Sequence, residues 1–373
     1  MAFAPEARPD SLKISGLEVW RLEGHAEQKP LSLDYLTIHT DAGIEGTYGP
    51  IDDSAIYFLE RQFAARLKGQ DPLAVEALWD TLFRASESPR GKAVMSALSA
   101  VDNALWDLRG RYYGQPVYRL LGGPTRPKID VYAACMGYSH EPEALRQRIQ
   151  SLQRQGFNRQ KWFFTRGPAD GLDGLRENVD LARRVRETLG EDGDAMFDCH
   201  AGWNLDYAIA WARQAEPFRP RWVEECFPPE QVMNYARLRR STSIPVASGE
   251  HLYGRWSVFD YLKSWALNIA QPDPEWSGGI GEAVRICAIA SLFDVPVMPH
   301  ASNLRAALHV VASQSPAICP LLEYPVEPMK RRLWFEKNPP HPSGGQIALD
   351  EAPGFGIELD STRVERRTRV LAA

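Results

Sequence analysis

The sequence predicts an α/β protein in which a closed parallel barrel follows an N-terminal α+β region. From about residue 129, short apolar segments alternate with helical ones, and seven or eight such units favour a closed barrel over an open sheet. Three acidic residues, Asp198, Glu224 and Glu250, lie 26 residues apart, and each closes an apolar segment. Carboxylates at the ends of successive parallel strands converge at one mouth of a barrel, where such barrels carry their active sites.

The N-terminal third combines strands and helices. Residues 17–22 and 35–40 alternate apolar and polar side chains as strands do, and a turn is expected at 41–46. Apolar residues at three- and four-residue steps predict helices, of which the last ends among glycines and prolines. These helices are expected at 54–68, 74–84 and 93–111.

Eight short apolar segments are the expected barrel strands: 129–134, 160–164, 194–198, 221–224, 245–248, 267–270, 295–298 and 320–323. Helical stretches fall between them, for example at 174–188, 205–215 and 279–292. The chain from about residue 340 is rich in proline and glycine, and we expect it to fold back on the N-terminal domain.

Composition and charge indicate a soluble protein without nucleic-acid or membrane partners. Hydrophobic residues make up 44% of the 373 residues, and the net charge of −5 includes no long run of either sign. The five cysteines form no CxxC pair, so neither a zinc site nor a disulfide framework is expected. Residues 1–15 lack the apolar run of a secretory signal, and no segment is long enough to span a bilayer, so we expect a cytoplasmic protein.

The three strand-end carboxylates predict a divalent metal site. Asp198, Glu224 and Glu250 offer hard oxygen ligands, which suit Mg²⁺ and leave room for water and substrate. Their spacing alone is weak evidence because acidic residues fill 48 of 373 positions. The stronger observation is that all three end a strand-like run.

An aspartate and a histidine close two further strands. Asp273 and His300 lie 27 residues apart, one barrel step, so they are expected to pair on neighbouring strands. A carboxylate that orients His300 raises its basicity and makes it a general base near neutral pH. His200 follows Asp198 by two residues and faces the same cavity if the strand continues that far, although the role of an ordinary loop histidine stays open.

Several motifs resemble the enolase superfamily in its mandelate racemase branch. They occur in family order over nearly the whole chain, at 102–123, 222–225 (WVEE), 248–250 (SGE), 271–273 (QPD) and 298–300 (MPH). The resemblance implies an α+β capping domain, here 1–125 completed by about 340–373, over a modified (β/α)7β barrel, here 126–339. It also implies Mg²⁺ on the three carboxylates and abstraction of a proton beside the substrate carboxylate.

Two more strand ends carry charged residues. Lys161 ends the second barrel strand, where its charge would lie beside the substrate carboxylate; the alternative is a solvated surface lysine. Glu323 closes the last strand and looks like the family's acid that donates a hydrogen bond to that carboxylate, a role that requires a raised pKa.

The sequence departs from the racemase pattern at one position. Racemases and epimerases of this branch carry Lys-x-Lys on the second strand, but Phe163 stands where the second lysine would be, which disfavours a two-base racemase. Segments 164–171, 224–229 and 271–279 are similar to rhamnonate dehydratases, which rely on a His–Asp dyad. The triplet 198–200 (DCH) is similar to galactonate dehydratases, in which that histidine helps expel the 3-hydroxyl.

The predicted function is therefore that of a Mg²⁺-dependent lyase that dehydrates an acid sugar, an aldonate or aldarate, to a 2-keto-3-deoxy acid. His300 removes the C2 proton, and His200 or His300 itself protonates the departing hydroxyl. His251, beside Glu250, is a weaker candidate for this acid. We expect a small-molecule sugar acid as the only partner and a homo-oligomeric state.

Two alternatives stay open. One is an epimerase or cycloisomerase on the same scaffold, against which Phe163 argues. The other is a metal-binding barrel that has lost catalysis, against which the His300–Asp273 pair argues. Loops at 24–29 and 49–56 are expected to select the substrate; His25 is either a contact for its hydroxyls or an exposed loop residue.

Overall fold

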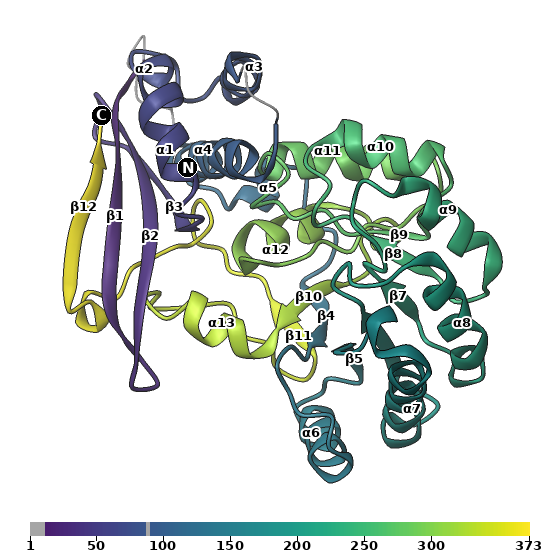
Figure 1. Cartoon of the computed structure of the whole chain (residues 1–373). Coiled ribbons are helices and arrows are strands. Elements are labelled where there is room, and N and C mark those ends of the chain that lie inside the picture. The colour runs from purple at the N-terminus through teal and green to yellow at the C-terminus, as the bar shows by residue number, and fades with distance from the viewer. Residues whose placement is uncertain (1–11, 87–89) are drawn as a thin grey trace.

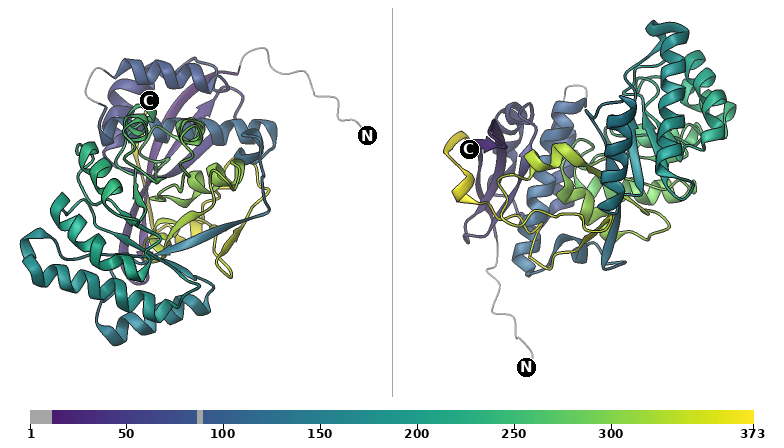
Figure 2. Two further views of the ribbon diagram at one scale, coloured as in Figure 1. Left: turned by 90° about the vertical axis from the view of Figure 1, so that its right-hand side faces the viewer. Right: turned by 90° about the horizontal axis from the view of Figure 1, so that it is seen from below.

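The chain forms two sheets with helices around them (Figure 1). The computed structural model describes residues 12–86 and 90–373, so most of the segment 1–15 considered above lies outside the described residues. The antiparallel sheet and its helices lie to one side of the larger parallel sheet, as the turned views also show (Figure 2). Within the described part of the chain, no helix is long and apolar enough to cross a membrane.

The N-terminal sheet is antiparallel, with strand order β12-β1-β2-β3. Its strands are β1 (Ile14–Ala26), β2 (Lys29–Thr40), β3 (Glu45–Ile51) and β12 (Arg366–Ala372). The predicted turn at 41–46 is too long, because β3 already begins at Glu45. The C-terminal strand β12 pairs with β1, as the expected fold-back requires. The domain boundaries themselves stay a prediction.

Helices at the three predicted N-terminal positions follow this sheet: α1 (Ala55–Phe58), a π-helical turn η1 (Leu59–Phe63) and α2 (Ala64–Leu67), then α3 (Val75–Ala85), α4 (Lys92–Tyr113) and the short α5 (Val117–Leu120). α4 packs on β3 and also on a helix of the barrel, α11 (Ile280–Ser291). It is therefore buried nearly all round, which explains why apolar residues recur along its whole length.

The second sheet is the predicted parallel barrel. Its parallel strands are β4 (Lys128–Ala134), β5 (Arg159–Phe163), β6 (Asp194–Asp198), β7 (Trp222–Glu224), β8 (Val246–Ser248), β9 (Ile269–Ala270) and β10 (Leu322–Pro325), and β11 (Gln346–Ala348) pairs antiparallel with β4. The surrounding helices are α6 (Pro142–Arg154), α7 (Gly171–Leu189), α8 (Leu205–Ala215), α9 (Val232–Ser241), α10 (Arg255–Lys263), α11 (Ile280–Ser291), α12 (Leu304–Ser313) and α13 (Val326–Arg332). Short 3₁₀ turns are η2 (Pro168–Asp170), η3 (Glu216–Phe218) and η4 (Ser361–Arg363).

One predicted strand, 295–298, is reduced to a single bridge between Val297 and Ala270. Pro296 and Pro299 lack the N–H groups that a longer ladder would use. The segment still bonds to both sides: Met298 N donates to Ala270 O at 2.9 Å, and Val297 N donates to Ile318 O at 2.8 Å. Because β10 pairs with β4, this segment completes the ring.

A cluster of buried side chains joins β4, β6, β7, β8, β9 and the segments before His300 and β10: Tyr132, Met196, Trp222, Ala247, Ile269, Met298 and Leu321. The Tyr132 and Trp222 rings meet edge to face with centroids 5.3 Å apart. This cluster closes the barrel, so the strand ends above it line a pocket rather than a channel.

A buried ion pair fixes the helix that follows His300. On α12, Arg305 donates from Nε to Glu336 Oε2 at 2.9 Å, and its other nitrogens donate to the backbone oxygens of Phe355 and Asn338, both at 3.0 Å. Arg305 is 2% exposed and Glu336 is fully buried. Burial raises the pKa of Glu336, and the guanidinium of Arg305 acts in the opposite direction.

We expect Arg305→Met to lower the free energy of unfolding by about 3–5 kcal/mol, because Glu336 would stay buried without its partner. Urea denaturation measures this loss. Replacing both residues by Met should recover most of it, and Arg176→Met, at an exposed position on α7, should change it by less than about 0.5 kcal/mol. An Arg305→Met variant as stable as the wild type would show that the pair contributes nothing.

Candidate active site

Three carboxylates converge at the carboxyl ends of neighbouring strands, as predicted. Asp198 ends β6, Glu224 ends β7, and Glu250 follows β8 by two residues. Asp198 and Glu224 are paired in the register of their parallel strands. One oxygen from each carboxylate lies within 4.8 Å of the others, and the first two residues are buried. Strand pairing, rather than chain proximity, brings them together.

Lys161 lies among these carboxylates and is 1% exposed, so the alternative of a surface lysine is wrong. Its Nζ lies 3.2 Å from Asp198 Oδ2 and 2.8 Å from Glu323 Oε1, and it donates to Glu224 Oε1. Burial alone lowers the pKa of an ammonium, but the surrounding carboxylates outweigh it and raise the pKa of Lys161. The second oxygen of Glu323, Oε2, is buried and has no hydrogen-bond partner among the described residues.

His300 and Asp273 form the predicted dyad. His300 Nδ1 lies 2.6 Å from Asp273 Oδ2, and the fully buried carboxylate also accepts from the backbone N–H groups of Glu275 and Ser302. A carboxylate acceptor assigns the proton to Nδ1. Nε2 then faces the other carboxylates, 3.6 Å from Glu250 Oε2 and 3.9 Å from Glu323 Oε2.

The charge around His300 controls its proton affinity. Burial lowers its pKa, but Glu250, Glu323 and the hydrogen bond to Asp273 outweigh burial and raise the pKa to about 10. A cation beside Glu250 would offset part of this negative charge and bring the pKa down toward neutrality.

Two known sequence families match this chain. Residues 144–363 match the family described as enolase C-terminal domain-like, and residues 25–122 match the mandelate racemase/muconate lactonizing enzyme N-terminal domain. The chain belongs to the enolase superfamily.

Relatives within the enolase superfamily cover most of the chain. An L-rhamnonate dehydratase of Saccharopolyspora erythraea is 34% identical over 312 residues, which are 82% of this chain and 77% of the relative. A D-galactonate dehydratase of Xanthomonas oryzae pv. oryzae is 33% identical over 354 residues, 89% of this chain and 90% of the relative.

Solved structures share the fold over the same length. A mandelate racemase/muconate lactonizing protein from Paracoccus denitrificans complexed with magnesium has a TM-score of 0.85 and 26% identity, over 96% of this chain and 99% of that one. A 3,6-anhydro-D-galactonate cycloisomerase from Zobellia galactanivorans has a TM-score of 0.82 and 27% identity, over 95% of this chain and 100% of that one.

A turn, rather than the expected continuation of the strand, positions His200 at the mouth of this enolase-superfamily barrel. The strand ends at Asp198 and does not continue, so strand alternation does not orient His200. Its φ of 48° is left-handed, and its backbone N–H donates to Asp198 Oδ1 at 2.9 Å. The exposed imidazole packs against Phe163, with ring centroids 5.0 Å apart.

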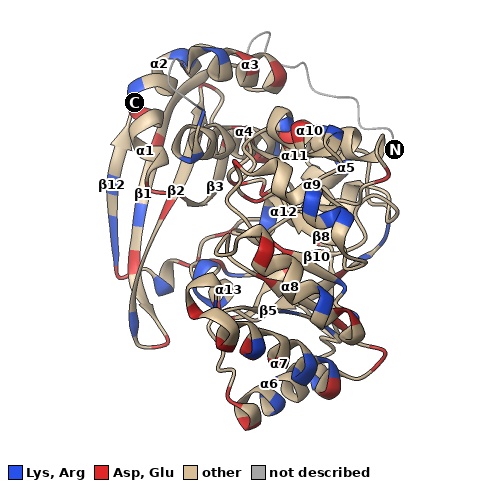
Figure 3. Cartoon of the chain, turned by 45° about the vertical axis from the view of Figure 1, so that its right-hand side comes forward, with Lys and Arg blue, Asp and Glu red and all other residues tan. Residues whose placement is uncertain are grey.

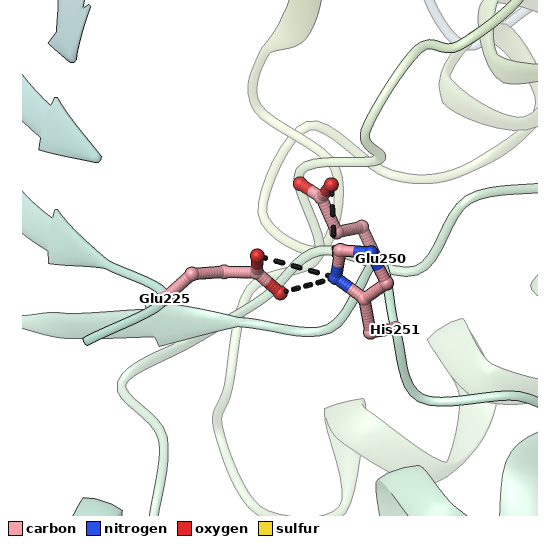
Figure 4. Close-up of side chains that lie close together, drawn as sticks. All are labelled: Glu225, Glu250 and His251. Atoms are coloured by element: carbon pink, nitrogen blue, oxygen red, sulfur yellow. Dashed lines mark hydrogen bonds and ion pairs between the residues drawn. The ribbon is translucent and has the colours of Figure 1, made fainter. Parts of the chain in front are cut away.

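Sequence reasoning missed a second histidine–carboxylate pair (Figure 4). His251 Nδ1 lies 2.9 Å from Glu225 Oε1, and Glu225, at 5% exposure, directly follows the ligand candidate Glu224. The Trp276 ring lies near both histidines, with its centroid 5.8 Å from that of His251 and 5.1 Å from that of His300. The sequence feature that could have indicated this pair is the doublet Glu224–Glu225 at a strand end.

Two buried groups that hold Glu224 in place were also missed. Trp222 Nε1 and Gln271 Nε2 both donate to Glu224 Oε2 at 2.8 Å. Gln271 belongs to the QPD motif and Trp222 to the WVEE motif, so the motifs contained both residues without revealing their contact.

The capping sheet contributes one of the two predicted loops. Residues 50–53 and part of β2, 31–34, line a cavity against the barrel. The predicted loop 24–29 lies instead in the β1–β2 hairpin and does not line that cavity. His25 Nδ1 pairs with Glu365 at 2.8 Å, and both side chains are more than half exposed, which fits the second reading of this histidine.

Proposed function

We propose that the protein is a Mg²⁺-dependent acid-sugar dehydratase, a lyase that converts an aldonate or aldarate to a 2-keto-3-deoxy acid. The observation that carries this proposal is that His300 Nε2, with Nδ1 held by Asp273, lies 3.6 Å from Glu250, one of the three converging carboxylates. A proton beside a carboxylate is weakly acidic, so its removal needs a base and charge stabilisation in the same place. The relatives named L-rhamnonate and D-galactonate dehydratase support this reaction class.

Asp198, Glu224 and Glu250 are the residues that would hold the ion. Their donor set is entirely oxygen, with one atom of each within 4.8 Å of the others, which suits Mg²⁺. When bound, Mg²⁺ stabilises the negative charge that develops on the substrate carboxylate. The magnesium complex of the similar Paracoccus denitrificans protein supports this choice.

Lys161 and Glu323 would bind the substrate carboxylate. The Lys161 ammonium adds positive charge in a buried site, where an electrostatic interaction is stronger than in water. Glu323 Oε2, which has no partner among the described residues, is available for a hydrogen bond to the substrate.

The proton steps fall to the histidines. His300 Nε2 accepts the C2 proton, while Asp273 keeps Nδ1 protonated and stabilises the imidazolium. The C3–O bond then breaks, and the hydroxyl leaves as water with a proton from His200 or from His300. The resulting enol tautomerises to the 2-keto-3-deoxy acid.

The test is a screen of the purified protein with Mg²⁺ against a library of aldonates and aldarates, with detection of 2-keto-3-deoxy products. Absence of product and of C2 proton exchange with every member would overturn the proposal. The cytoplasmic location and the homo-oligomeric state stay predictions from the sequence.

The phenylalanine at position 163 argues against epimerisation and cycloisomerisation, and this prediction can be tested. Because no lysine base stands at position 163, only one C2 epimer should lose its proton. Incubation of substrate in D₂O should give a dehydrated product without build-up of the opposite epimer, as NMR spectroscopy measures. Interconversion of epimers, or a cyclised product without loss of water, would favour the alternative to which the similar cycloisomerase belongs.

His200→Asn tests the identity of the general acid. General acids contribute about 10²–10⁴-fold, so dehydration should slow by an amount in that range while C2 exchange by His300 continues. A 3-fluoro substrate analogue should partly rescue the variant, since fluoride leaves with less help from a proton. Equal loss of exchange and dehydration without rescue would make His200 a positioning residue, and His251→Asn would then be the next variant to measure.

A further inference from the structure

A cavity of about 650 Å³ lies between the capping sheet and the barrel. Its walls come from β2, the segment after β3, α4, the loops after β9 and before α12, and α13. The volume falls in the range of roughly 300–1,000 Å³ that is usual for small-ligand sites. The cavity is therefore large enough for part of a sugar acid.

One wall of this cavity contacts the His300–Asp273 dyad. Glu275 and Ser302, which line it, donate their backbone N–H groups to the two oxygens of Asp273. Trp276, also in the wall, packs against the His300 ring at 5.1 Å. The cavity therefore directly adjoins the dyad.

Most charged groups of the cavity already have partners. Arg21 binds Asp34 through two hydrogen bonds of 2.8 Å. Asp52 accepts from Ser54 Oγ at 2.6 Å and lies 3.6 Å from Lys92 Nζ. Tyr48 donates to Glu275, and burial raises the pKa of that carboxyl well above its usual range. Asp53 stands exposed at the rim.

Arg331 and Arg332, at the end of α13, differ from these groups because neither forms an ion pair in the part of the chain that the structure describes. Among the described residues, Arg331 donates only to a neutral group, the backbone oxygen of Pro30, at 2.7 Å. Arg332 lines the cavity half-buried and has no hydrogen-bond acceptor or ion-pair partner within the described ranges 12–86 and 90–373. Its charge nevertheless acts on Glu275, because it opposes the effect of burial on that carboxyl's pKa. Figure 3 shows α13 with its basic residues beside the β1–β2 hairpin.

Two serines, Ser96 and Ser302, line the same walls. Ser96 Oγ and Ser302 Oγ are buried and have no hydrogen-bond partner among the described residues, although Ser96 is 3% and Ser302 7% exposed. A buried hydroxyl without a partner is costly unless a ligand supplies one. Among the described residues, the cavity thus combines a guanidinium that has no hydrogen-bonded counterion with two serines whose hydroxyl oxygens lie just beneath its surface.

We propose that this cavity receives the end of the substrate farthest from the reacting carboxylate, and that Arg332, with Arg331, binds a second anionic group there. The preferred substrate is then an acid sugar with two anionic ends, either an aldarate or an aldonate phosphorylated at its far end. A guanidinium binds carboxylate and phosphate in the same two-pronged geometry, so both sources share this chemistry. The inference rests on the proposed dehydratase function.

The test compares matched sets of three acids that have the same configuration and chain length. For each set, kcat/KM is measured with the aldonate, the aldarate and the terminally phosphorylated aldonate, all with Mg²⁺. The wild type should prefer an acid with two anionic ends. A preference for the aldarate indicates a carboxylate at the second end, and a preference for the phosphorylated aldonate indicates a phosphate. Arg332→Met should reduce that preference roughly ten- to hundredfold, since a hydrogen bond to a charged group is lost.

Two further variants separate recognition from folding. Arg332→Lys should keep part of the preference, because lysine retains the positive charge but lacks the two-pronged hydrogen-bonding geometry of the guanidinium. Arg176→Met, exposed on α7, should leave every constant at the wild-type value. A wild type that prefers the aldonate, or an Arg332→Met variant that weakens all three substrates equally, would overturn the inference and leave the dehydratase function intact.

If no acid sugar reacts or exchanges its C2 proton, calorimetry can still measure the binding of acid sugars to the protein. Such a lack of reaction overturns the proposed function, but the subsite can be tested by binding of aldarates and aldonates in the presence of Mg²⁺. Tighter binding of the aldarate that depends on Arg332 supports the subsite. Equal binding of both acids by the wild type and by Arg332→Met overturns it.

Discussion

Replacing Glu224 by Gln should abolish turnover and weaken Mg²⁺ binding by more than about 100-fold. Loss of a group that merely supports a metal ligand typically costs about 10–100-fold in affinity, and loss of the ligand's own charge should exceed that. Glu224 is fully buried and accepts from Trp222, Gln271 and Lys161, so the Gln side chain keeps its shape but removes one negative charge from the triad. Isothermal titration with Mg²⁺ and the dehydration rate measure the two effects.

The matched control is Glu143→Gln, on the exposed face of α6, which should change neither quantity. Circular dichroism shows whether Glu224→Gln still folds. A folded Glu224→Gln protein that binds Mg²⁺ like the wild type would contradict the assignment of the ligands. Asp198→Asn should behave like Glu224→Gln, because both carboxylates contact the same buried Lys161 ammonium.

Much of the fold could be predicted from the sequence because each barrel unit repeats the same local pattern. β4 to β8 lie at the predicted segments, since buried parallel strands are short apolar runs. The strand at 295–298 could not be judged from apolarity alone, because its prolines remove donors from the ladder. β12 was missed because its residues, 366–372, are mostly charged or exposed on the edge of a sheet.

The candidate site was predictable where strand geometry dictates position. Asp198, Glu224, Asp273 and His300 end strands or strand-like segments, and parallel pairing brings strand ends together. His200 was different, because a left-handed turn after Asp198 decides where it points, and a turn of this kind in a residue other than glycine has no simple sequence signal. The contacts of Glu225 and Arg332 depend on tertiary packing between distant segments.

His300→Asn should reduce exchange of the C2 proton with solvent deuterium by about 10²–10⁴-fold or more, the contribution typical of a general base. Asn can still accept or donate a hydrogen bond to Asp273, but it cannot take up a proton at neutral pH. Mg²⁺ affinity should stay near the wild-type value, because His300 is not among the three carboxylate ligands. NMR detection of deuterium at C2, together with titration calorimetry, measures both quantities.

The dependence of exchange on pH distinguishes a base from a residue that only shapes the pocket. In the protein without metal, burial lowers the pKa of His300 but the neighbouring carboxylates raise it to about 10. Only the unprotonated Nε2 can accept a proton, so the wild-type rate should rise with pH through a pKa that Mg²⁺ brings below this value. Asp273→Asn should shift that rise and lower the rate less than His300→Asn does, because the imidazole remains while its orientation and basicity change. If His300→Asn kept both the wild-type exchange rate and its rise with pH, another group would be the base, and His200, which packs against Phe163, would be the next candidate to test.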